Sequence, residues 1–159
     1  MDRRRLVLAA SSAAALSTSA VIAPSAAVQV VRSSVPEYVG AMTVMRRNAD
    51  WVLQEVSQLM AAEDRDDEEW RIDVLAPFAV VEAVREAGRT IAPPGKYADA
   101  HLSWLDAVDE LVAAGLHLRT GVLDDNQRSV DLATRAMDRA RDLLVEVDVA
   151  LPRRVRGTT

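Results

Sequence analysis

The sequence predicts an all-α protein: an antiparallel up-down-up-down four-helix bundle preceded by an N-terminal signal segment. Two observations predict this fold. Apolar residues recur at steps of three and four along four successive segments, which is the spacing of one face of a helix. The sequence lacks the two patterns that would indicate β structure: period-two alternation, which is typical of strands, and an Asn-Gly or Asp-Gly turn, which is typical of hairpins. Short breaks between the four segments favour antiparallel neighbours.

Residues 1–27 have the composition of a signal peptide. Arginines at 3–5 precede an uncharged, Ala-rich stretch at 6–23, and small residues near Ala27 suit a signal peptidase. Two Arg, a spacer and two apolar residues also resemble a twin-arginine signal, with the general secretory route as the alternative. An uncleaved membrane anchor is a further alternative, although Ser and Thr hydroxyl groups lower the hydrophobicity of the stretch at 6–23. We expect a periplasmic or extracellular protein, associated with the cell envelope or free of it, that meets the membrane only through this segment.

The bundle is predicted to span 34–152, after a linker at 28–33 and before a basic tail at 153–159. The first helix starts at Ser34, because Ser34 and Glu37 have capping-box spacing. Seven apolar residues then share one face of the first helix: Tyr38, Met42, Met45, Ala49, Val52, Val56 and Leu59.

The second helical segment follows the acidic run at 63–69, with Asp66 and Glu69 at capping-box spacing. Its apolar face consists of Trp70, Val74, Phe78, Val81 and Val84. Pro77 cannot donate a backbone hydrogen bond, so we expect a kink near Asp73 or two shorter helices. Gly88 is the predicted end of this segment.

A Pro-Pro-Gly loop at 90–95 separates the third helix, predicted from about residue 96 to Leu118 with Gly121 as its end. Its apolar face holds Trp104, Val108, Leu111, Gly115 and Leu118, with His101, Leu105 and Val112 beside it. Asp124 and Gln127 form the capping pair predicted for the fourth helix, which Pro152 ends. The fourth apolar face consists of Val130, Ala133, Met137, Ala140, Leu144, Val147 and Leu151.

Charge and composition exclude several functions. Residues 28–150 carry 13 basic and 23 acidic residues, and such an acidic body repels nucleic-acid phosphates. Aromatic residues make up only 4% of the chain, which argues against stacking platforms for single strands. The chain has no Cys, so disulfides, thiolate metal sites and Cys nucleophiles are excluded. We therefore expect no nucleic-acid partner.

No sequence motif indicates catalysis. The chain contains neither Glu-x-x-His nor His-Glu-x-x-His, and its Ser residues lack the Gly-x-Ser-x-Gly turn. We predict a non-enzymatic protein with no catalytic residue and no cofactor. The acidic run (Asp64, Asp66, Asp67, Glu68 and Glu69) could attract calcium weakly, but helix capping on a solvated turn is the favoured interpretation.

His101 and Trp104 are the only candidate cofactor-binding residues. His101 lies beside the apolar face, where a histidine is more often hydrogen-bonded to a neighbouring helix or to the Pro-Pro-Gly loop. The sharper hypothesis makes it a haem or metal ligand, or a pH sensor. His101 and His117 stand too far apart along one helix to share a metal ion. If His101 alone contributes to a metal site, the sequence does not indicate which metal.

A family resemblance supports the same fold. The chain resembles uncharacterised exported helical-bundle proteins from bacteria whose proteins are rich in Arg and Ala. The shared features are the Ala-rich signal, Trp70, Pro93-Pro94, Ala100-His101, Gly121-x-x-Asp124, and the spaced Ala133, Ala136 and Ala140. The resemblance implies a bundle outside the cytoplasm and brings no catalytic residues. Many such proteins have a lipobox Cys that this chain lacks, so no lipid tether is implied.

Two functions are consistent with these features. The first is an exported interaction module, whose partner is an unknown protein, an envelope component or the chain itself, in an oligomeric state that the sequence leaves open. The alternative is a small-molecule, haem or metal-binding bundle with a pocket near Pro77, His101 and Trp104.

Overall fold

The computed structural model describes residues 31–62, 64 and 67–151, and this part of the chain is all-α. Its helices are α1 (Val35–Ala61), α2 (Glu68–Leu75), α3 (Phe78–Arg89), α4 (Ala98–Leu123) and α5 (Gln127–Ala150). The 3-10 turn η1 (Gly95–Tyr97) precedes α4. Two short strands that the sequence did not predict, β1 (Val31–Arg32) and β2 (Ile91–Ala92), pair in parallel.

Several predictions fall outside the described residues. These are the signal peptide at 1–27, the linker up to residue 30, Asp66, Pro152 and the basic tail at 153–159. Within the described ranges, no helix is both long and apolar enough to cross a membrane.

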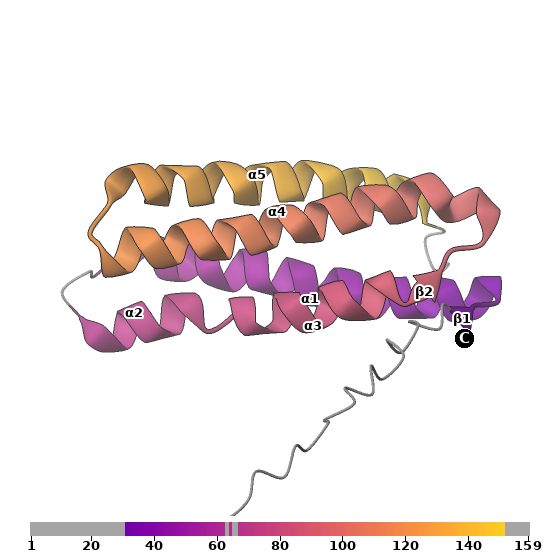
Figure 1. The fold of residues 1–159 in the computed structure, drawn as a ribbon, viewed down its shortest axis with the longest axis horizontal. Helices are drawn as coiled ribbons and strands as arrows, with labels where there is room; N and C mark the ends of the chain where they lie inside the picture. The colour runs from indigo at the N-terminus through magenta and orange to yellow at the C-terminus, as the bar shows by residue number, and fades with distance from the viewer. Residues whose placement is uncertain (1–30, 63, 65–66, 152–159) are drawn as a thin grey trace, which may run out of the picture.

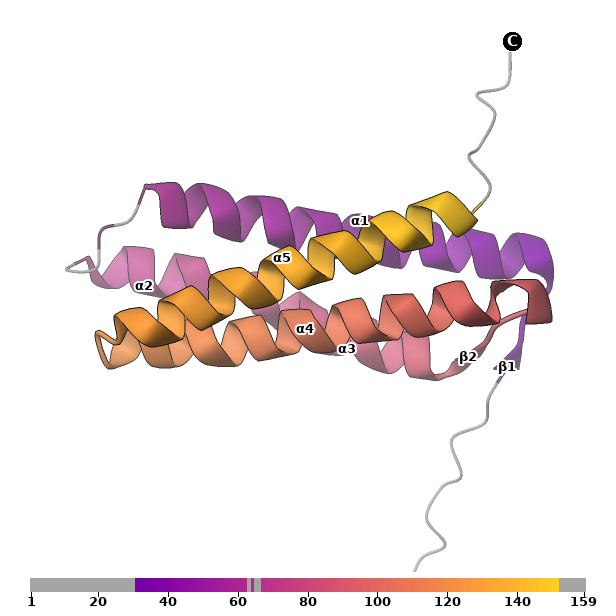
Figure 2. The same cartoon turned by 90° about the horizontal axis from the view of Figure 1, so that it is seen from above.

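The helices lie lengthwise beside one another in two layers, one of α4 and α5 and the other of α1 with α2 and α3 (Figure 1). The C-terminal end of α1, the start of α2 and the α4–α5 connection lie at one end, while β2 and η1 connect α3 to α4 at the other. Seen from above, α5 crosses α1 obliquely (Figure 2). The backbones of α4 and α5 make the most extensive close approach, whereas α1 and α5 are joined by side chains, Arg46 with Asp148 and Ser57 with Arg141.

The first helix begins and packs as predicted. The backbone N–H of Ser34 donates to Oε2 of Glu37 over 2.9 Å, as in a capping box. Six of the seven residues predicted for the apolar face are buried, and Leu59 is partly buried. The α1 stripe therefore forms one wall of the core.

Pro77 divides the second segment into two shorter helices, one of the two predicted outcomes. The break lies at Ala76 and Pro77 because Pro77 has no N–H to continue the ladder. The predicted cap was placed one residue early: the N-cap of α2 is Asp67, whose carboxylate accepts the N–H of Glu69 over 3.0 Å.

Two glycines predicted as helix ends lie inside helices. α3 continues past Gly88 to Arg89, and α4 continues past Gly121 to Leu123. Both glycines are buried at close helix contacts: a Cβ on Gly88 would overlap Trp104, and one on Gly121 would meet the side chain and backbone of Val130. Because they have no side chain, these glycines allow neighbouring helices to pack closely. The hydrophobic pattern of a single helix does not reveal such contacts between helices.

The cap predicted for the last helix was also wrong. α5 starts after Asn126, whose side-chain oxygen accepts the N–H of Ser129 over 3.2 Å. Asp124 instead ends α4. Asp125 between them has φ of 48°, a left-handed conformation that Asp tolerates better than most residues. This turn shifts the cap two residues beyond the predicted position.

Candidate functional site

His101 lies in a buried aromatic cluster, which we define as Tyr38, Tyr97, His101 and Trp104. The first turn of α4 places His101 beneath Tyr38 of α1, and only 5% of the histidine is exposed. The Tyr38 hydroxyl lies 3.3 Å from Nδ1 of His101. The ring centroids of Tyr38 and Tyr97 are 5.3 Å apart, and those of His101 and Trp104 are 6.0 Å apart. His101 thus bonds to a neighbouring helix, the favoured expectation.

Burial sets the protonation of this aromatic cluster. Desolvation lowers the pKa of His101 from its ordinary 6.5, and a hydrogen bond with the backbone of Gly88 opposes that shift. Desolvation also raises the pKa of Tyr38 to about 12. Both rings are therefore neutral at pH 7. A neutral imidazole has one donor and one acceptor nitrogen, so Tyr38 donates to Nδ1 while the ring donates to the Gly88 carbonyl.

Trp104 fills the space beside His101 completely. None of its surface is exposed, and its ring lies directly on Gly88. Its Nε1–H has no hydrogen-bond partner among the described residues. A ligand on His101 and Trp104, the two predicted cofactor-binding residues, would have to displace a packed ring.

The structure does not bring Pro77 to the aromatic cluster. Trp104 meets α3 at Gly88, and Pro77 lies eleven residues earlier, about 16 Å away at the rise of a helix. The pocket predicted near Pro77, His101 and Trp104 therefore joins residues that are separated along α3. Of these three, His101 and Trp104 lie together and Pro77 does not.

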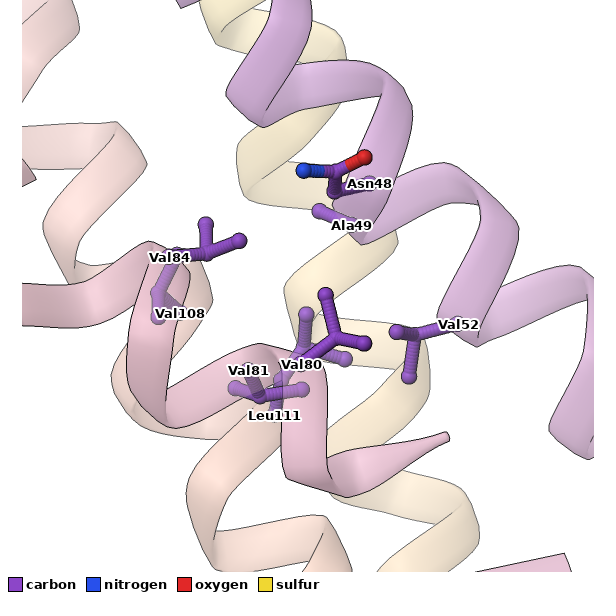
Figure 3. A pocket seen from close by; sticks show the side chains of 8 residues that line it. All are labelled: Asn48, Ala49, Val52, Val80, Val81, Val84, Val108 and Leu111. Carbon is purple, nitrogen blue, oxygen red and sulfur yellow. The ribbon is translucent and has the colours of Figure 1, made fainter. Parts of the chain in front are cut away.

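A separate apolar hollow lies between α1, α3 and α4 (Figure 3). It is lined by Asn48, Ala49, Val52, Val80, Val81, Val84, Val108 and Leu111. It is too narrow for a water molecule, and Asn48 supplies its only polar side chain. We interpret it as a packing gap, since binding sites need room and convergent polar groups.

The acidic run does not form a metal centre in the part that the structure describes. No group of three or more His, Asp or Glu side chains among the described residues could hold an ion. Asp67 is engaged as the cap of α2. The described members of the run act as expected for the favoured interpretation, at a helix N-terminus.

The outer face of α4 carries a second apolar stripe, which we call the α4 seam. Leu102, Leu116 and Leu123 are 59%, 63% and 57% exposed. Leu105 and Val112 are partly buried. With two charged residues, the α4 seam advances at alternating steps of three and four: Leu102, Leu105, Asp109, Val112, Leu116, Arg119 and Leu123. α4 thus has two apolar faces, one in the core and one toward solvent.

α3 borders the middle of the α4 seam. Phe78 lies against Gly115, where a Cβ would come within 2.8 Å of the phenyl ring. Phe78, Glu82, Val112 and Leu116 help to line a hollow of about 160 Å³ that opens to solvent. The α4 seam and this hollow together form a shaped apolar surface.

The charge at the centre of the α4 seam is held in place by α3. Oδ1 of Asp109 accepts Nε–H of Arg85 over 2.6 Å and lies 3.6 Å from Nη2 of Arg89. Glu82 lies 3.7 Å from the same Arg85. Asp109 therefore keeps a fixed position on the exposed side of α4.

Sequence reasoning missed the α4 seam. It assigned Leu105 and Val112 to the margin of the core face and left Leu102, Leu116 and Leu123 unassigned. The signal was present, because one helix face cannot hold all the apolar residues of α4. Reading the segment for two stripes would have found it.

Comparisons of the chain with family models, with curated proteins and with solved structures found no match. The function is therefore inferred from the residues themselves.

Proposed function

We propose that the chain is an exported, non-enzymatic helical-bundle protein that binds a protein partner through the α4 seam. One observation carries the proposal: three leucines on a single line of one helix are more than half exposed. Covering each would stabilise a complex by about 1–2 kcal/mol, since burying a whole leucine is worth up to about 3 kcal/mol.

The composition of the α4 seam supports a specific interface. Interfaces combine an apolar centre with a polar rim, and contiguous exposed apolar surface on a soluble protein marks such sites. Leu116 and Val112 lie at the centre of the α4 seam, beside the Phe78 hollow. Asp109 and Arg119 interrupt the apolar residues and would fix the register of a bound helix.

We propose an antiparallel up-down-up-down arrangement for the helical rods, with α2 and α3 as one rod broken at Pro77. Support comes from the connections, which alternate between the two ends (Figure 1). The capping residues Asp67 and Asn126 stand where the chain reverses.

We propose export by the signal peptide at 1–27, so that the partner belongs to the periplasm, the cell envelope or the cell exterior. Support comes from the arginines, the Ala-rich stretch and the small residues of that segment, and from the resemblance to exported bundle proteins. N-terminal sequencing of protein recovered outside the cytoplasm is expected to start near residue 28. Full-length protein with Met1 confined to the cytoplasm would disprove export.

The non-enzymatic part of the proposal rests on the lack of a catalytic motif in the sequence, and the burial of His101 supports it. His101 is 5% exposed and its hydrogen bonds are used within the fold. A general base must come within hydrogen-bond distance of its substrate, which this packing prevents.

Photo-crosslinking tests the binding surface. A photoreactive amino acid at Leu116 is expected to capture one defined protein in cells. The matched control is the same amino acid at Val145, which is 59% exposed on α5. Equal or no capture at the two positions would contradict a binding role for the α4 seam, and mass spectrometry of the adduct identifies the partner.

One observation favours the small-molecule part of the alternative, a ligand that accepts a hydrogen bond. Buried polar groups normally have partners, and the Nε1–H of Trp104 has none among the described residues. An absorption spectrum and a native mass of the purified protein test for a bound group. A colourless protein with the mass of the bare chain would remove this alternative.

A further inference from the structure

We infer that the α4 seam binds a second copy of this chain, with the two α4 helices antiparallel. This inference rests on the proposed function, because it names the partner of the same surface. The spacing of the α4 seam is that of a helix packed lengthwise on another helix, in which positions three and four apart alternate along the contact.

Six of the seven residues of the α4 seam match their own reverse, and Leu102 lies beyond the end of the second copy's α4. In one antiparallel register, Leu105 faces Leu123 of the second copy, and Val112 faces Leu116 of the second copy. The same register places Asp109 opposite Arg119 of the second copy. Twofold symmetry repeats each pair, so the contact has four apolar pairs and two pairs of opposite charge.

Other registers lose this match. A shift of one heptad puts Asp109 opposite Val112 and Leu102 opposite Arg119, which sets charges against apolar groups. A parallel, in-register pair puts Asp109 opposite Asp109 and Arg119 opposite Arg119, and like charges repel. Complementary charge therefore favours a second, antiparallel copy.

The surroundings of the α4 seam fit this occupant. The Phe78 hollow beside Val112 has space for Leu116 of the second copy, as a knob enters a hole. Asp109 is bonded to Arg85 and Arg89, and three further acidic residues lie around it against one further basic residue: Glu82, Asp106 and Glu110 against Arg139. The approaching Arg119 thus meets net negative charge.

The first test measures the mass of the full chain, as recovered from cells, by sedimentation across a concentration series. Twice the chain mass is expected. Leu116→Glu should raise the dissociation constant at least about a hundredfold, because it buries a charge at an apolar contact. Val145→Glu, at a residue of similar exposure on α5, should leave the dimer unchanged. Circular dichroism confirms that both variants fold.

The second test addresses the charge pairs. Arg119→Glu places like charges opposite Asp109 twice in each dimer, so dissociation should rise about tenfold and ease in high salt. Arg135→Glu, at an exposed position of α5, is the matched control and should not alter dissociation. Equal effects of the two variants would overturn the register.

Cysteine crosslinking defines the direction of the helices, because the chain has no native Cys. A mixture of the Leu105→Cys and Leu123→Cys proteins should form a disulfide between the two variants on mild oxidation. Neither variant alone should crosslink, since each position would lie about 27 Å from its own copy along the paired helices. Self-crosslinking of either variant would overturn the antiparallel arrangement.

The outcomes separate this inference from the proposed function. A monomer at every concentration, with no disulfide in the mixture, overturns the second-copy inference. If Leu116 then captures a different protein, the proposed function stands with another partner. If Leu116 captures nothing, both fail.

Discussion

Gly88 of α3 packs directly on the indole ring of Trp104 in α4, so closely that a Cβ on Gly88 would overlap Cζ3 of the ring. Trp104 has no exposed surface and cannot swing outward without opening the core. A glycine inside a helix normally costs about 0.5–1 kcal/mol relative to alanine. Here the missing side chain is what allows α3 and α4 to approach each other.

We therefore expect Gly88→Ala to lower the free energy of unfolding by about 1–3 kcal/mol, because the added methyl group overpacks the core. Gly40 provides the control: it also lies within a helix, but nothing lies within 4 Å of a Cβ placed there. Gly40→Ala should stabilise the protein by about 0.5–1 kcal/mol through better helix propensity. Urea unfolding compares the two, and equal effects would contradict the Trp104 contact.

The buried His101 predicts acid sensitivity. Because burial lowers its pKa below 6.5, the unfolded chain binds more protons than the folded one as pH falls through that value. The contribution of neutral His101 to the free energy of unfolding should be fully present above pH 6.5. It should be lost progressively as the pH falls from 6.5 to the lowered pKa of the folded state. Protonation also makes Nδ1 a donor facing the Tyr38 hydroxyl, which is fully buried.

Thermal unfolding at pH values of about 7.5 and about 5.5 measures this effect, since other side chains seldom titrate in that interval. His101→Gln should unfold with a smaller difference between the two conditions than the unchanged chain. His117→Gln, on the same helix, is the matched control for the loss of a histidine. A pH dependence that survives in His101→Gln would assign it to another group.

Tyr38→Phe should lower the free energy of unfolding by about 1–2 kcal/mol, since Nδ1 of His101 loses its donor in a buried place. The variant should also lose an alkaline transition. The pKa of Tyr38 is about 12 in the folded chain, above that of an exposed tyrosine, so its neutral form stabilises the fold below pH 10 and the effect is lost as pH rises toward 12. Phenolate absorbance measures the transition, and an amplitude near pH 12 that is as large in Tyr38→Phe as in the unchanged chain would assign it elsewhere.

Local pattern predicted the elements well and their contacts less well. The stripe of α1, its capping box and the division at Pro77 depend on residues that are close in sequence, so the sequence alone predicted them. Gly88 and Gly121 were interpreted as helix ends because glycine usually ends helices. Their contacts with Trp104 and Val130 join different helices, and one segment's pattern does not contain them.

Of the two candidate sites, one depends on contacts between distant residues and the other lies within a single helix. His101 was expected to bond a neighbouring helix, but its partner Tyr38 is 63 residues away in the chain and could not be named from spacing. The α4 seam was encoded within one helix and was missed for a different reason. Its leucines form a second stripe on the same helix, and a prediction of one apolar face per helix does not include them.

The turn between α4 and α5 gives a last prediction. The side chain of Asn126 caps α5 at Ser129, so Asn126→Ala should lower the free energy of unfolding by about 1 kcal/mol. Asp124 stands two residues earlier and is the C-cap of α4. Its backbone N–H donates to the carbonyl of Thr120. Asp124→Ala retains that N–H and should change stability by less than about 0.5 kcal/mol. Urea unfolding separates the two variants, and a larger loss for Asp124→Ala would mean that Asp124 caps α5 after all.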